Sequence, residues 1–155
     1  MRNKQVKNAI LKAARGGNEL RRGGTVMVRL ANGQCGLCNA AELCDTDDII
    51  RLSRLAGSAP SLILTAPRLS SLGRVLREGC PVATVTLSKS HYKAFSDIAF
   101  EKSDLHNFEN ITIIGESTGS LADVSAKLLR SAKLVPAGLF VRLPLREVAA
   151  QERFA

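Results

Sequence analysis

The sequence predicts a layered α/β or α+β domain. Short β-prone runs alternate with stretches whose apolar residues recur at helical spacing. The chain has 155 residues, so residues 1–155 are expected to form a single domain. A content of 45% apolar and 23% charged residues is typical of soluble globular proteins. No internal repeat, low-complexity tract or linker interrupts the alternation, which favours sheet and helices packed in layers.

The chain begins with a basic segment of helical periodicity. Apolar residues at i, i+3, i+4, i+7 and i+8, counted from Val6, predict a helix over 3–15, which Gly16 and Gly17 are expected to end. We treat residues 1–16 as a basic N-terminal helix. Residues 1–22 hold seven basic groups and one acidic group, so this segment carries +6 of the net charge of +8. Such a cluster could bind phosphate groups, RNA or an acidic protein, and a solvated helix face is the simpler alternative.

Turn and capping signals delimit the elements of the middle of the chain. The Asn32-Gly33 pair predicts a hairpin or a sharp loop. Asp45 or Thr46 is expected to cap a helix that Gly57 closes. The other elements expected here are strands at 25–29, 61–66 and 82–87, a helix at 69–77 and a helical stretch at 92–100.

The last third of the chain continues the alternation. Ser120-x-x-Asp123 is a capping pattern, and it opens a helix whose apolar stripe begins at Leu121. We also expect strands at 111–115 and 137–143 and a short terminal helix at 146–153.

Several classes of protein are disfavoured. No apolar run approaches the ~20 residues of a membrane-spanning helix. The basic N-terminus lacks the apolar stretch and the small-residue cleavage site of a secretory signal. We therefore expect a cytoplasmic protein that does not associate with membranes. His91 and His106 are expected at the surface or in loops rather than as catalytic bases.

The cysteines allow two interpretations. Their uneven spacing does not suggest a disulfide framework. Cys35-x-x-Cys38 together with Cys44 would offer three sulfur ligands, but a tetrahedral zinc site needs a fourth ligand from a distant segment. Reduced thiols and no bound metal are the simpler expectation, and the role of these three cysteines stays open.

Three stretches of the chain share one resemblance. The first is Leu20-Arg21-Arg22-Gly23-Gly24, with Asn39-Ala40-Ala41-Glu42 after the next loop. The second is the strand Leu62-Ile63-Leu64, and the third is Leu134-Val135-Pro136-Ala137-Gly138. In this order they resemble the 3,4-dihydroxy-2-butanone 4-phosphate synthase family of riboflavin biosynthesis, which has a basic-glycine entry, an Ala-Ala-Glu and a Leu-x-Pro-Ala-Gly. The resemblance implies a mixed sheet flanked by helices and a homodimer. A family related to tRNA threonylcarbamoylation has a broadly similar fold and is the nearest alternative.

The resemblance also implies which residues should be catalytic. The family holds a divalent metal with a Glu and a His, and it moves protons with carboxylates. Counted back from Ala40-Ala41-Glu42, the acids of its catalytic loop fall on Asn32, Gln34 and Gly36. Amides do not take up a proton near neutral pH and do not neutralise a dication.

The remaining catalytic positions are changed as well. Counted back from Pro136, the family's metal-binding His falls on Leu121, with Asp123 where a Glu stands. The family's Cys falls on Leu64 and one of its Asp residues on Ser88. The resemblance therefore implies a degenerate member of the family. No cofactor or metal is expected, and Mg²⁺ would be needed only by an active site.

Three functions follow from these observations, in descending order of preference. The first is a catalytically inactive domain with a structural or regulatory role in riboflavin biosynthesis, whose expected partners are a second copy of the chain and GTP cyclohydrolase II. The second is an active or altered lyase that converts ribulose 5-phosphate to dihydroxybutanone phosphate and formate, with Arg21, Arg22 and Glu42 as substrate contacts. The third is a nucleic-acid-binding module that uses the basic N-terminal helix.

Overall fold

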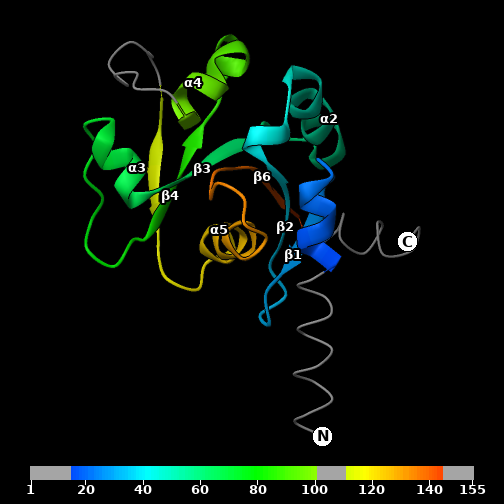
Figure 1. The fold of residues 1–155 in the computed structure, drawn as a ribbon, viewed down its shortest axis with the longest axis horizontal. Coiled ribbons are helices and arrows are strands. Elements are labelled where there is room, and N and C mark those ends of the chain that lie inside the picture. Colours follow the sequence, from blue (N-terminus) through cyan, green and yellow to red (C-terminus); the bar gives the residue numbers. More distant parts are fainter. Residues whose placement is uncertain (1–14, 101–110, 145–155) are drawn as a thin grey trace, which may run out of the picture.

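The structure, a computed structural model, describes residues 15–100 and 111–144 (Figure 1). The terminal helix predicted at 146–153, and all but the last residue of the helix predicted at 3–15, lie outside the described residues. Six strands form one sheet in the order β1-β2-β6-β3-β4-β5. The strands are β1 (Val26–Arg29), β2 (Cys35–Ala40), β3 (Ser61–Thr65), β4 (Val82–Thr86), β5 (Ile113–Glu116) and β6 (Gly138–Leu143).

The sheet is antiparallel at every pairing of these strands. The predicted layered α+β architecture is confirmed, whereas the resemblance implied a mixed sheet. The reason is the position of β6, which inserts between β2 and β3 and runs antiparallel to both. Strands β2 and β3 consequently run parallel to each other without being neighbours.

Helices cover the two faces of the sheet and enclose two core clusters. Helix α5 (Leu121–Ser131) packs on one face, apart from α2 (Thr46–Ala56), α3 (Ala66–Ser71) and α4 (Phe95–Phe100) on the other (Figure 1). Successive strand residues alternate between the faces. In β3, for example, Leu62 and Leu64 join the larger cluster, and Ile63 joins the smaller cluster under α5. Within the described residues, no helix is long and apolar enough to cross a membrane.

The N-terminal helix runs further than its glycines suggested. Residues 15–21 are helical, so Gly16 and Gly17 do not end the helix. A Cβ on Gly17 would lie 3.3 Å from the Cβ of Ala132, which follows α5. Glycine serves here to let two helices approach closely. The actual end is Gly23, which has φ +79° and donates its N–H to Leu20 O at 3.0 Å.

Three further elements differ from what the sequence alone predicted. The Asn32-Gly33 pair predicted a hairpin or a sharp loop after β1, and a hairpin forms, but the extent of its second strand, β2, was not predicted, because β2 is buried on both faces between β1 and β6 and lacks alternation. The helix expected at 69–77 is α3, which begins earlier and ends at Ser71. Pro67 lies in its first turn, where a missing N–H costs little. The stretch predicted at 92–100 consists of the 3-10 helix η2 (Lys89–Ala94) followed by α4.

The cap predicted for α2 is confirmed. The Asp45 carboxylate accepts a hydrogen bond from the backbone N–H of Asp48 at 3.0 Å, and the Asp48 carboxylate accepts one from the N–H of Asp45 at 3.0 Å. Gly57 closes the helix with φ 69°. This reciprocal capping satisfies two backbone donors that the helix itself leaves without partners.

We predict that Asp45→Ala lowers the free energy of unfolding by about 1 kcal/mol, because the cap hydrogen bond to the first turn of α2 is lost. Urea denaturation measures this loss. Asp47→Ala is the matched control: Asp47 lies in the same first turn without a capping bond, so only about 0.5 kcal/mol from the helix dipole should disappear. Equal losses in the two variants would contradict the capping role.

Candidate functional site

A small cavity of about 180 Å³ lies where the turn between β1 and β2, the start of α5 and the end of β6 meet. We call it the turn cavity. It is lined by Asn32, Gly33, Gln34, Cys35, Leu121, Arg142 and Leu143. Asn32, Gln34 and Leu121 are three of the positions at which the resemblance placed lost catalytic groups. The fold thus brings together residues that were predicted to share one site although they lie far apart in the sequence.

The turn that carries Asn32 connects β1 to β2 over residues 30–34, and the hydrogen bond between Leu30 and Gln34 encloses three residues at its tip. Leu30 donates its N–H to Gln34 O at 2.8 Å, and Gly33, with φ +91°, donates its N–H to Leu30 O at 3.0 Å. The Asn32 Oδ1 atom accepts the N–H of Gln34 at 3.0 Å. Glycine in the left-handed region at the end of the turn is typical of short β-hairpins, and the Asn-Gly pair predicted such a turn. The Asn32 carboxamide is therefore held by its own turn.

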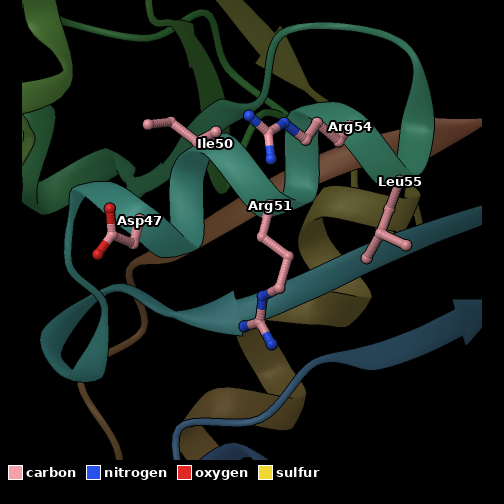
Figure 2. A pocket seen from close by; sticks show the side chains of 5 residues that line it. All are labelled: Asp47, Ile50, Arg51, Arg54 and Leu55. Atoms are coloured by element: carbon pink, nitrogen blue, oxygen red, sulfur yellow. The ribbon is translucent and has the colours of Figure 1, made fainter.

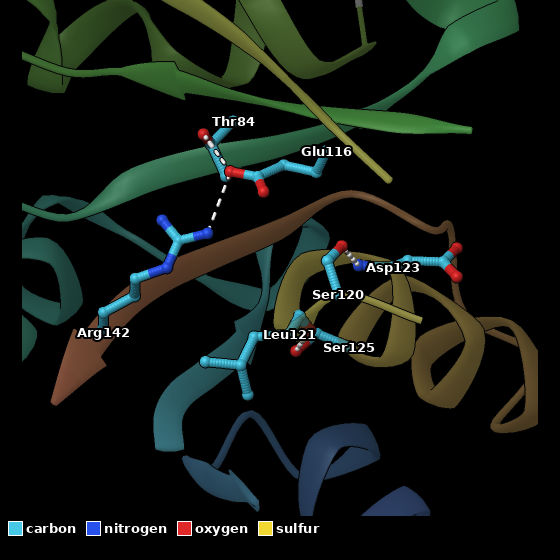
Figure 3. Close-up of polar contacts among 7 residues, drawn as sticks. All are labelled: Thr84, Glu116, Ser120, Leu121, Asp123, Ser125 and Arg142. Carbon is cyan, nitrogen blue, oxygen red and sulfur yellow. Dashed lines mark hydrogen bonds and ion pairs between the residues drawn. The ribbon is translucent and has the colours of Figure 1, made fainter. Parts of the chain in front are cut away.

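The wall of the cavity opposite the turn begins with Leu121, the first residue of α5. Ser120 caps this helix by accepting the N–H of Asp123 at 3.3 Å (Figure 3). Leu121 is only 3% exposed and belongs to the core cluster that includes Ile63 and Phe140. As the apolar stripe predicted, the side chain at this position contributes to packing.

The residues of the turn cavity do not fit a divalent metal. They supply two neutral carboxamides but no carboxylate and no imidazole, whereas Mg²⁺ sites in proteins use carboxylates. Arg142 also places a positive charge in the lining, which repels a cation. Among the residues that the structure describes, no group of three or more His, Cys, Asp or Glu side chains could hold a metal ion.

Gly36 has no room for the acid that the resemblance places at this position. A Cβ there would lie 2.6 Å from Cε2 of Phe140 and 3.1 Å from the backbone oxygen of Val141. Both neighbours belong to β6, and Phe140 is almost fully buried. Glycine at this position is required by the packing of β2 against β6.

A polar cluster beside the turn cavity was missed by the sequence reasoning. Arg142 Nη2 lies 2.9 Å from Glu116 Oε1, and Thr84 Oγ1 donates to the same oxygen at 3.2 Å (Figure 3). The guanidinium carbon of Arg142 is 5.5 Å from the centre of the Phe140 ring. The ion pair connects β6 to β5, although β3 and β4 lie between these strands. The only indication of this cluster in the sequence was Arg142, a single charged residue within the apolar run 138–143.

Asp123 is buried, and it is bonded both to the turn before α5 and to a side chain of α5 itself. Its carboxylate accepts the N–H of Gly119 at 2.8 Å and lies 2.9 Å from Nζ of Lys127. Burial by itself would raise the pKa of Asp123, but the hydrogen bond from Gly119 and the ammonium group of Lys127 outweigh it and hold the pKa below its ordinary value. The residue is therefore ionised at neutral pH, and it is not part of the lining of the turn cavity.

The other predicted positions lie elsewhere. Leu64 is fully buried in the core cluster on the sheet face opposite α5. Ser88 caps η2, and its Oγ lies 3.0 Å from Nδ1 of His91. His91 is buried, with 7% exposure, whereas we expected a surface or loop histidine. His106 lies outside the described residues.

Two of the three predicted substrate contacts make structural bonds near the other end of α5. Arg21 Nη1 donates to the backbone oxygen of Ala132, at the C-terminus of α5, at 3.1 Å. The Glu42 Oε1 atom accepts the N–H of Val135 at 2.9 Å. Arg22 is exposed. The structure does not bring these three side chains to the turn cavity.

The cysteines do not gather into a metal site. Both Cys35 and Cys38 lie in β2, and they belong to opposite core clusters. Burial raises the pKa of Cys38 to about 12 and that of Cys44 to about 12. These two thiols stay protonated at neutral pH, so they are poor ligands and poor nucleophiles.

A larger depression of about 500 Å³ lies on the outer side of α2 (Figure 2). It is lined by Asp47, Ile50, Arg51, Arg54 and Leu55. All five belong to one exposed helix surface, and none of them is a predicted site position. The turn cavity is therefore the better candidate, because it joins three separate elements.

The strand order and the helices on both faces define the class of protein at the level of its architecture, an α+β domain built on one antiparallel sheet. No protein-family model matches the sequence, and no curated protein matches it. The structure is similar to the crystal structure of RibBX, a two-domain 3,4-dihydroxy-2-butanone 4-phosphate synthase from A. baumannii, with a TM-score of 0.61 and 14% identity. The match covers 84% of this chain and 47% of that chain, so this chain spans about half of its length. This likeness establishes the fold, and function must be argued from the site.

We predict that Asp123→Asn lowers the free energy of unfolding at neutral pH, because the variant loses the charge that Gly119 and Lys127 stabilise. A carboxyl group whose pKa is lowered by folding stabilises the protein above its unfolded pKa, about 3.9. This contribution is lost as the pH falls through the lower pKa of the folded state. Urea denaturation over a pH series should therefore show the two proteins converging below about pH 4. A difference that stays constant through this range would contradict the role of the charge.

Proposed function

We propose that this chain is a non-catalytic domain with a structural or regulatory role in riboflavin biosynthesis. One observation carries the proposal. Asn32, Gln34 and Leu121, which the resemblance aligns with catalytic acids and a metal-binding histidine, line a single cavity that has no carboxylate and no imidazole. The convergence supports the alignment, and the chemistry of the three side chains argues against catalysis.

Conversion of a sugar phosphate to dihydroxybutanone phosphate and formate requires a base that removes protons next to a carbonyl group. Neither carboxamide in the turn cavity can act as this base near neutral pH. Asp123 is the nearest carboxylate in sequence to Leu121, but it is already bonded to Gly119 and Lys127. The close approach of Phe140 to Gly36 argues further that the acid missing from this position could not be restored by a simple substitution.

We propose that this domain acts through partner proteins, and that the partners are a second copy of this chain and GTP cyclohydrolase II. The similarity to RibBX supports an association with a further domain, because RibBX is a two-domain protein and this chain matches only 47% of it.

Purified chain, incubated with ribulose 5-phosphate and Mg²⁺, should release no formate above the rate of a reaction without protein. An active dihydroxybutanone phosphate synthase assayed in parallel provides the positive control. Circular dichroism should show that the chain is folded under the same conditions. The double variant N32A/Q34A separates true turnover from contamination. If the wild type releases formate and the variant does not, the result contradicts the non-catalytic assignment.

The partner is tested by mixing the chain with GTP cyclohydrolase II from the same source. Size-exclusion chromatography with light scattering should show a complex heavier than either protein alone, and the chain by itself should elute as a dimer. Separate elution at all concentrations, with an unchanged cyclohydrolase rate, would argue against the companion role.

A further inference from the structure

The turn between β1 and β2 carries a reactive dipeptide, and this feature is independent of the proposed function. Asn32 is exposed, and Gly33 follows it in the left-handed region of the backbone. A Cβ on Gly33 would meet no atom within 4 Å. Gly33 has no side chain, and no atom lies within 4 Å of the place where a Cβ would be, so no side chain hinders the approach to its backbone nitrogen, which donates its hydrogen to Leu30 O at 3.0 Å.

We propose that Asn32-Gly33 is a site of spontaneous deamidation in the folded protein. The Gly33 nitrogen attacks Cγ of Asn32 and forms a new N–Cγ bond, which closes a five-membered imide. The Cγ–Nδ2 bond breaks, and ammonia leaves with the proton that the Gly33 nitrogen gives up. Water then opens the imide at either of its two carbonyl groups, which yields aspartate or isoaspartate. The only co-reactant is water, and no electron is transferred.

The turn favours this reaction in two ways. The nucleophile and the electrophile are joined by the chain itself, so attack is intramolecular. The N–H of Gln34 donates to Oδ1 of Asn32 at 3.0 Å, and this hydrogen bond stabilises the negative charge that grows on the oxygen during attack. The N–H of Gly33 is held by Leu30 O at 3.0 Å, and this bond must open first. This hydrogen bond lies at the tip of a short hairpin, where it breaks more easily than the hydrogen bonds of the core strands.

The two other asparagines in the described residues lack this combination. Asn39 is fully buried in β2 and is followed by Ala40. Asn18 is exposed, but residues 15–21 are helical, and Glu19 follows it. Burial excludes the water that opens the imide, and a helical backbone resists the rotation that attack requires. Both asparagines serve as internal references for the rate at Asn32.

The reaction would change the turn cavity. Aspartate at position 32 places a carboxylate in a lining that now holds neutral carboxamides and Arg142. In isoaspartate the main chain continues through the carbonyl group of the side chain, which adds one atom to the backbone and so lengthens the turn. The chain would thus exist in an amide form and in acid forms that differ by one negative charge at this site.

The test uses the folded full-length chain in neutral and mildly alkaline buffers. Intact-mass spectrometry should show a gain of one dalton that grows with time and faster at the higher pH. Peptide mapping should place the change at Asn32 before any change at Asn18 or Asn39, with aspartate and isoaspartate as separate products. Ion-exchange chromatography should show a parallel shift of one charge.

Asn32→Gln is the matched control, because it keeps the carboxamide but would have to form a larger and slower ring. This variant should lose the early mass gain. A sample of wild-type chain unfolded in urea reports the reactivity of the free dipeptide. The proposal is overturned if the unfolded chain converts at Asn32 while the folded chain does not, or if the folded variant N32Q gains mass as fast as the wild type.

Discussion

Strand β6 determines how the rest of the molecule is arranged. Its insertion between β2 and β3 keeps these two strands, which run parallel, from pairing with each other, and it joins the N-terminal hairpin to the other strands. One side of this strand presents Phe140 and Arg142 to the face covered by α5. Phe140 lies over Gly36, and Arg142 reaches both the turn cavity and Glu116. Packing and polar contacts near the candidate site therefore originate from the same strand.

The polar residues on this side of the domain are largely engaged in holding the structure together. Asp123 binds the turn before α5, and Arg21 binds the carbonyl at the end of the same helix. Each charge complements the helix terminus near which it lies. Glu116 and Arg142 connect two strands that are not neighbours. Groups of the kind that catalysis uses are present, but their hydrogen-bonding capacity is directed at the backbone and at each other.

Sequence patterns predicted much of the fold. The cap at Asp45, the turn at Asn32-Gly33 and the apolar stripe from Leu121 were predicted because each depends on residues close together in the chain. The grouping of Asn32 and Gln34 with Leu121 came from the resemblance instead. The role of Arg142 was missed, because its partner Glu116 lies on a strand that only the tertiary structure brings within reach. Gly17 was misread, because a glycine that ends a helix and a glycine that admits a neighbouring helix look alike in sequence.

The sequence by itself determined part of the local structure: the caps of α2 and α5, the tight turn at Asn32-Gly33, and which side chains are carboxamides or aliphatic rather than acids or imidazoles. The tertiary structure decided the order of the strands, the burial of Gly36 under Phe140, and the use of Asp123, Arg21 and Glu42 as structural contacts. The reason is physical. Caps and turns arise from bonds between near neighbours, whereas strand order and side-chain contacts across the domain depend on how complete elements pack against each other.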